Sequence, residues 1–210
     1  MVEGLIAISV GMDDDMGKRK KKLSFDELCA IRNQVYTDLE AESDRGLALV
    51  TADYLSNLLE ALLRQVFVDG RSKGMKDILS GLFAEVGPLG TFATRTRLAF
   101  LMGLIGTDTY HALEVIRDLR NDAAHSVAPF SLESPGPREM CRRLTDWEAC
   151  QKQSEAAGQT GRQQFMFAMW WVAVELMLRT GRRRHAEIGK EFCIPFDDLP
   201  NDDDPDDVSD

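Results

Sequence analysis

Apolar residues recur along this chain at intervals of three and four positions, the spacing that places them on one face of an α-helix. The first such stripe consists of Leu28, Ile31, Val35 and Leu39. Ser24 and Glu27 precede it with the spacing of a capping box, in which two side chains satisfy each other's free backbone N–H groups. We therefore expect a helix that begins at Ser24.

A longer stripe predicts a second helix from about Leu47 to Val68. Its apolar positions are Ala52, Leu55, Leu59, Leu62 and Val66. A second face of the same helix is polar and carries Asp53, Asn57, Glu60 and Arg64. Glu60 and Arg64 are four positions apart, so they are expected to form an ion pair along the helix. The Asp69-Gly70 sequence is expected to end it.

The same reasoning predicts helices over residues 76–84, 91–104, 108–124 and 138–150. Gly87-Pro88-Leu89-Gly90 predicts a rigid turn between the first two. Gly106 should end the second of these helices, and Thr107 should be the N-cap of the third. A loop is expected before the fourth, marked by Pro129, Pro135, Gly136 and Pro137.

The stretch over residues 165–178 is almost wholly apolar, and Glu175 is its one charged residue. It is too short to cross a bilayer, which takes about 20 residues, so it is expected to be a central buried helix. Gly181 fits a C-terminal cap. The following Arg182–Arg184 run suits the negative end of the helix dipole, and the same run is a candidate nucleic-acid contact.

No alternating apolar and polar run has the length of a strand. The pattern therefore predicts an all-α fold, a single helical bundle of about six or seven helices with residues 55–67 and 165–178 at its centre. We expect a flexible arm over residues 1–22, a helical domain over 23–194 and a disordered acidic tail over 195–210.

The formal net charge is −10, part of which comes from the aspartates of the tail. Such a field repels a phosphate backbone, so direct DNA binding is disfavoured. The basic run Lys18–Lys22 is the other candidate contact for nucleic acid, and a solvated leader is its more ordinary interpretation.

The chain shows no signal peptide and no apolar run of bilayer length, so we expect a cytoplasmic protein with no membrane partner. None of its four cysteines forms a Cys-x-x-Cys pair, and no histidine lies at zinc-ligand spacing from them. We interpret them as reduced thiols that mostly fill the core, and we expect no metal and no cofactor. The cysteines are Cys29, Cys141, Cys150 and Cys193.

Four short sequences occur in order between Leu58 and Ser126. They are Leu62-Leu63-Arg64-Gln65-Val66-Phe67, Gly87-Pro88-Leu89-Gly90, Arg95-Thr96-Arg97-Leu98 and Leu119-Arg120-Asn121-Asp122-Ala123-Ala124-His125. In order and spacing, this segment resembles the mannitol operon repressor family of bacteria over about a third of the chain. The resemblance implies an all-helical domain and a role in regulating genes for sugar-alcohol uptake.

Members of that family are named repressors yet lack an obvious helix-turn-helix. This sequence also shows no short helix pair with a basic second helix suited to a major groove. With the acidic charge, this favours repression through a protein partner, with the chain as a homodimer. Candidate binding residues are Asp53, Asn57, Glu60, Arg95 and Arg97.

The Arg120…His125 element also resembles the signature of HEPN domains, which are helical and often act as metal-independent RNases. The resemblance implies an active site of Arg120, Asn121 and His125, usually completed across a dimer. His125 would exchange a proton with a ribose 2′-OH or the leaving oxygen. Arg120 would stabilise charge on the phosphoryl group, and Asn121 would orient the histidine or a phosphate oxygen.

A purely structural role is the alternative, because Arg and His near a helix C-terminus also favour its dipole. Positions five apart on one helix point about 140° from each other, so catalysis needs a helix that ends near His125 or a second subunit. Arg120 is expected at the rim of the core. Our leading hypothesis is a transcriptional regulator of the mannitol-repressor type that acts through protein contacts. A HEPN-type endoribonuclease acting on RNA is the alternative, and direct DNA binding is third.

Overall fold

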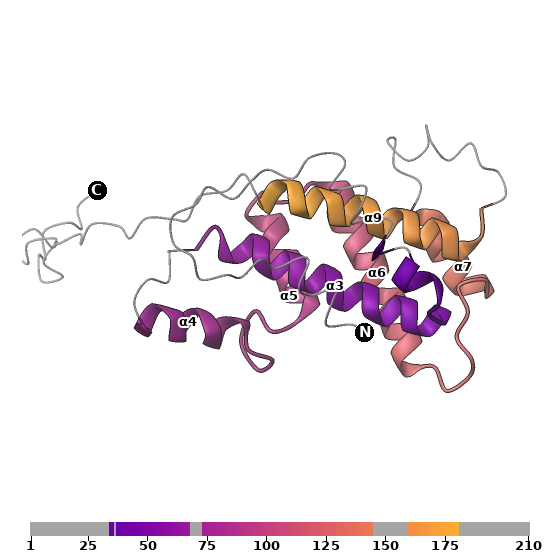
Figure 1. The fold of residues 1–210 in the computed structure, drawn as a ribbon, viewed down its shortest axis with the longest axis horizontal. Coiled ribbons are helices and arrows are strands. Elements are labelled where there is room, and N and C mark those ends of the chain that lie inside the picture. Colours follow the sequence, from indigo (N-terminus) through magenta and orange to yellow (C-terminus); the bar gives the residue numbers. More distant parts are fainter. Residues whose placement is uncertain (1–33, 36, 68–72, 145–158, 181–210) are drawn as a thin grey trace, which may run out of the picture.

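The computed structural model describes residues 34, 35, 37–67, 73–144 and 159–180, and all regular structure in these ranges is helical. Residues 34–35 and 37–40 are helical. The longer elements are α3 (Asp44–Arg64), α4 (Lys73–Phe83), α5 (Phe92–Leu101), α6 (Thr107–His125), α7 (Pro135–Arg143) and α9 (Gly161–Thr180) (Figure 1). The prediction of an all-α bundle is confirmed.

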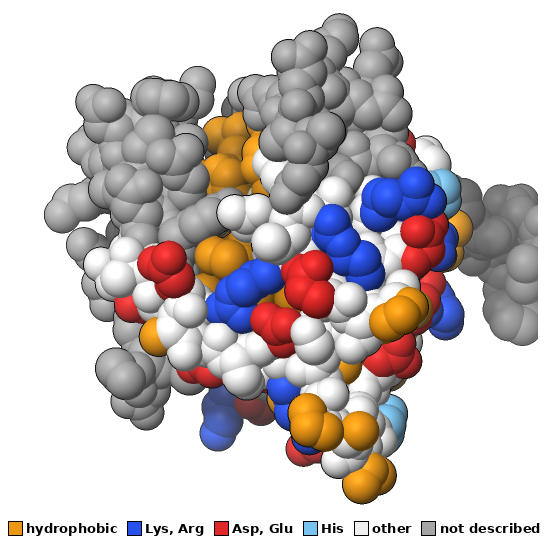
Figure 2. Space-filling view, turned by 90° about the vertical axis from the view of Figure 1, so that its right-hand side faces the viewer, with side chains coloured by type: hydrophobic (Ala, Val, Ile, Leu, Met, Phe, Trp, Pro, Cys, Tyr) orange, Lys and Arg blue, Asp and Glu red, His pale blue; other side chains and the backbone are white. Residues whose placement is uncertain are grey.

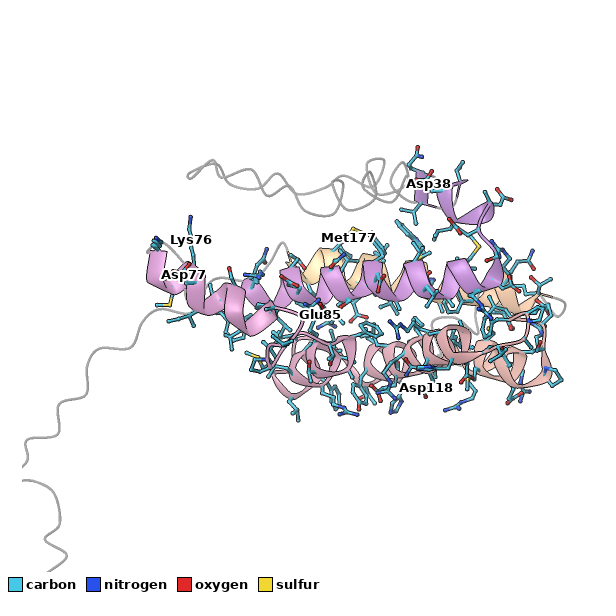
Figure 3. All side chains as sticks on the ribbon, turned by 90° about the horizontal axis from the view of Figure 1, so that it is seen from below. Asp38, Lys76, Asp77, Glu85, Asp118 and Met177 are labelled. Atoms are coloured by element: carbon cyan, nitrogen blue, oxygen red, sulfur yellow. The ribbon has the colours of Figure 1, made fainter. Side chains whose placement is uncertain are left out.

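Two long helices form the centre of the bundle. α3 packs against α5, α6 and α9, and α9 also contacts α6 and α7. Figures 1 and 3 show α3 and α9 side by side in one layer, with α5, α6 and α7 in a second layer beneath them. The prediction that these two apolar segments lie at the centre is confirmed.

The core is built from leucines of α3 and from mixed apolar residues of the helices around it. Its largest fully buried side chains are Phe165, Leu47, Leu55, Leu59, Leu62, Leu63, Leu113, Ile116, Leu119, Leu132, Leu144 and Met169. Burial of each such side chain stabilises the fold by about 1.5–3 kcal/mol relative to exposure. Val35 and Leu39 belong to the same core, as their apolar stripe predicted.

α3 begins at Asp44, three residues before its predicted start. The Ser43 side chain accepts a hydrogen bond from the Gly46 N–H at 3.1 Å, and Asp44 lies in the positive first turn. The helix ends at Arg64 rather than Val68. The predicted stop at Asp69-Gly70 lies outside the described residues.

By length and composition α3 could cross a membrane, contrary to our expectation that no segment could. Its apolar side chains nevertheless contact other helices, and 56% of its most apolar window is buried inside the protein. These contacts are those of a core helix.

α5 ends at Leu101, earlier than predicted, because Gly103 adopts a left-handed φ of 65° that turns the chain. Gly106 is the N-cap of α6, and Thr107 is its first helical residue, so the predicted Thr107 cap is wrong. Gly106 has the extended backbone of a cap without a side chain that could accept a bond.

α7 begins at Pro135, so the predicted loop does not extend through Pro135, Gly136 and Pro137. Proline is favourable in a first helical turn, where its missing N–H would have no intrahelical partner. α9 begins at Gly161, four residues before the predicted apolar stretch. Glu175, the one charged residue of that apolar stretch, contacts Thr109 and forms an ion pair with Arg179.

Cys141 is a free thiol in the core, and burial raises its pKa to about 12. This confirms the core-filling interpretation for that cysteine. Several predictions concern segments outside the described residues. These are the arm over 1–22, the helix start at Ser24, the end of the predicted 138–150 helix, the Gly181 cap, Arg182–Arg184, the tail over 195–210, and Cys29, Cys150 and Cys193.

Candidate functional site

The predicted catalytic residues lie in the last turns of α6. Leu119 and Ala123 are fully buried and anchor this part of the helix in the core. Arg120 is half-buried, which confirms its predicted place at the rim of the core, and its Nη1 donates a long 3.4 Å hydrogen bond to Asn121 Oδ1.

α6 ends at His125, whose ring is exposed. The helix therefore lasts long enough for Asn121 and His125, four positions apart, to share a face. Within the described part of the chain no hydrogen bond joins Arg120 to His125, since their directions differ by about 140° around the helix. One chain thus brings Arg120 and Asn121 together and leaves His125 apart from Arg120.

His125 opens instead into a pocket of about 410 Å³ between the end of α6 and the start of α7. The pocket is lined by Asp122, His125, Ser126, Pro129, Phe130, Ser131, Ser134 and Pro137. Neither Arg120 nor Asn121 lines it. Of the predicted catalytic residues, this pocket therefore holds His125.

The loop over residues 126–134 forms much of the pocket wall, and Arg45 of α3 holds its first part. The Arg45 guanidinium donates through Nη2 to the carbonyl oxygens of Ser126 at 2.7 Å and Ala128 at 2.8 Å. The Ser126 hydroxyl donates to the same Ala128 carbonyl at 2.9 Å. These bonds fix the chain where it leaves α6.

Asp44 holds the second part of the loop. Its Oδ2 accepts hydrogen bonds from the Leu132 N–H at 2.9 Å and the Ser131 hydroxyl at 3.2 Å. Its Oδ1 forms an ion pair with Arg162 of α9 at 2.7 Å. Leu132 is fully buried, so the loop is anchored by packing as well as by charge.

The predicted binding residues on α3 and α5 fall into two groups. Glu60 pairs with Arg64 at 2.8 Å, as predicted, and also with Arg95 at 2.8 Å. Arg97 and Asp53 are exposed and Asn57 is half-buried. Within the described ranges no ion pair or hydrogen bond engages these last three side chains.

Arg95 is buried, with 7% of its surface exposed. Its guanidinium donates to the Leu89 carbonyl at 2.7 Å, to the Ser56 hydroxyl at 2.9 Å and to the Phe83 carbonyl at 3.3 Å. Burial lowers the pKa of Arg95, an effect that Glu60 opposes and Arg64 adds to. Its bonds join the Gly87–Gly90 turn to α3 and leave it little capacity for an outside ligand.

Sequence reasoning did not single out Asp44, Arg45 or Arg162. The Ser43-Asp44 start of α3 carries a capping signal that could have drawn attention to Asp44. Nothing local could have paired it with Arg162, because 118 positions separate the two residues.

Comparison with known proteins places these features in a family. A family model described as "Mannitol repressor" matches residues 31–180, which is more than half of the chain. No curated protein matches the sequence. The fold is similar to that in the X-ray structure of the MtlR-HPr complex from Escherichia coli, with a TM-score of 0.58 and 18% sequence identity over 71% of this chain and 99% of that one. The chain belongs to the mannitol repressor family.

Proposed function

We propose that this protein is a transcriptional regulator of the mannitol-repressor type, and that it acts by binding a protein partner, HPr. The observation that carries the proposal is the family match over residues 31–180 together with the likeness of the fold to MtlR, which was solved in complex with HPr. We place the protein in the cytoplasm as a homodimer.

The disposition of the arginines supports a protein partner over a DNA backbone. Seven arginines of the described chain form ion pairs with carboxylates of this protein. They are Arg64, Arg95, Arg117, Arg138, Arg142, Arg162 and Arg179. Phosphate contacts need cations that are free to replace counterions, and the net charge of −10 opposes them further.

Figure 2 shows the end of the molecule where α7 and the start of α9 lie. Basic and acidic side chains alternate across this face, and hydrophobic side chains gather at its lower edge. This face therefore lacks the uniform basic stripe that nucleic-acid binding would use.

Calorimetric titration of the purified protein with HPr from the same organism tests the proposal. We expect saturable binding, and no salt-sensitive binding to a duplex that carries the mannitol operator. Absence of HPr binding, combined with duplex affinity that falls steeply with salt, would overturn it. Light scattering on the same sample measures whether the protein is a dimer.

A second candidate is a HEPN-type, metal-independent endoribonuclease. It is favoured by one observation: α6 ends at His125 and exposes its ring, which is the arrangement that catalysis requires. Because Arg120 does not contact His125 in one chain, this activity needs a second copy to complete the site.

A further inference from the structure

We propose that the pocket at the end of α6 binds a neutral polyhydroxylated ligand, an acyclic polyol of the mannitol type. The chemistry of the pocket identifies the ligand as neutral and rich in hydroxyl groups. The choice of a polyol within that class rests on the proposed function.

Hydrogen bonds from α3 hold the loop that lines the pocket. Arg45 fixes the carbonyls of Ser126 and Ala128, and Asp44 fixes Ser131 and Leu132, all through charge-assisted hydrogen bonds. A loop without regular structure ordinarily loses entropy when it orders around a ligand. Here the loop is already ordered in the folded protein, so ligand binding loses less entropy, which favours affinity for a small molecule.

Three polar side chains of the lining have no hydrogen-bond or ion-pair partner among the described residues: Asp122, His125 and Ser134. Ser134 is the N-cap of α7, yet its hydroxyl makes no cap hydrogen bond. A carboxylate accepts, a neutral imidazole donates at one nitrogen and accepts at the other, and a hydroxyl does both. Together they offer complementary groups to a ligand that presents several hydroxyls.

The rest of the lining is apolar. Pro129, Phe130 and Pro137 supply surfaces on which the C–H groups of a polyol can pack. The volume of about 410 Å³ lies within the usual range for small-molecule sites, about 300–1,000 Å³.

Other ligand classes fit less well. An anion would meet the Asp122 carboxylate in a protein of net charge −10. A metal ion would find one carboxylate and one imidazole, and the described residues contain no cluster of three or more metal-ligating side chains. The combination of donors, acceptors and apolar rings favours a neutral molecule.

Saturation-transfer NMR with D-mannitol on the full-length protein tests the site. We expect transfer to mannitol in the wild type, and a Kd that rises about tenfold in Asp122→Asn and in His125→Gln, because each loses one charged or directional hydrogen bond. Asp77→Asn is the matched control, since Asp77 is exposed on α4 at the opposite end of the molecule (Figure 3). Its Kd should equal that of the wild type.

Two results would overturn the site. One is absence of transfer to mannitol and to sorbitol from a wild-type protein that melts cooperatively. The other is mannitol binding that Asp122→Asn and His125→Gln leave unchanged, because the ligand then binds elsewhere. Titration of HPr in the absence of polyol separates the two proposals: HPr binding without mannitol binding defeats the pocket alone, and the reverse defeats the HPr proposal alone.

Discussion

Asp44 and Arg162 form a 2.7 Å ion pair that joins the first turns of α3 and α9. Asp44 and Arg162 each make further hydrogen bonds to other segments. Asp44 holds the loop after α6, and Arg162 donates to the carbonyls of Leu39 and Glu42 at 2.8 Å. Three stretches that are distant in sequence, residues 39–44, the loop after α6 and the start of α9, therefore meet at one pair of half-buried charges.

Asp44→Ala should lower the free energy of unfolding by about 2–4 kcal/mol, because the Leu132 N–H and the Ser131 hydroxyl lose their acceptor and Arg162 loses its carboxylate partner. Urea denaturation measures the change. Glu139→Ala is the control, since the Glu139–Arg142 pair lies on the surface and its loss should leave the midpoint almost unchanged. Equal midpoints for both variants would show that the junction contributes little.

Arg95→Met should destabilise the protein by about 2–4 kcal/mol, because three acceptors and the Glu60 carboxylate lose a buried donor. Arg95→Lys should not restore stability, since an ammonium cannot span these partners as a planar guanidinium does. Thermal melting compares both with Arg97→Met, an exposed neighbour whose loss should shift the Tm little. A Tm for Arg95→Met as high as that of Arg97→Met would show that the buried bonds of Arg95 contribute little to stability.

Replacement of Gly87 and of Gly81 by alanine should change the stability of the protein in opposite directions. A Cβ at Gly87 would collide with the backbone carbonyls of Gly81 and Leu82, so Gly87→Ala should cost about 1–3 kcal/mol. A Cβ at Gly81, inside α4, meets nothing within 4 Å, and Gly81→Ala should stabilise by about 0.5–1 kcal/mol. Differential scanning calorimetry decides the signs, and a stabilising Gly87→Ala would show that the turn differs from the one described.

Stability should fall as the pH rises above about 10, because burial raises the pKa of Tyr54 to about 12. Between those values the unfolded chain has lost the phenolic proton while the folded chain retains it, so folding binds a proton. The expected slope is about 1.4 kcal/mol of lost stability per pH unit. Cys141, with its pKa also raised to about 12 from 9.0, adds a loss that begins at lower pH. Urea midpoints from pH 9 upwards should therefore decline less steeply for Tyr54→Phe than for the wild type, and parallel curves would refute the assignment.

If the second candidate function holds, the purified protein should cleave single-stranded RNA in the presence of EDTA and leave 2′,3′-cyclic phosphate ends. Arg120→Ala and His125→Ala should each abolish cleavage, and a mixture of the two variants should recover part of it, because the site would form across two copies. Gel analysis of labelled RNA measures all three. No cleavage by the wild type on several RNAs would remove this candidate and leave Arg120 and His125 with binding or structural roles.

Local sequence patterns were sufficient to predict most of the helices. The Glu60–Arg64 pair and the central burial of α3 and α9 follow from spacings of three and four, because helix geometry alone places those residues together. The ends of the helices were harder to predict from the sequence. The start of α7 at Pro135 and the cap at Gly106 depend on which backbone N–H groups remain free, and the loop signals of Pro and Gly do not distinguish these cases.

The candidate site divides along the same line. From helix periodicity alone, Arg120, Asn121 and His125 could be assigned to one helix on which positions five apart diverge, and the net charge alone disfavoured a phosphate backbone. The burial of Arg95, the Asp44–Arg162 pair and the pocket that His125 shares with Asp122 and Ser134 became visible in the folded chain. Periodicity fixes neighbours within a few turns, whereas contacts across more than a hundred positions arise when the buried faces of α3, α6 and α9 pack together.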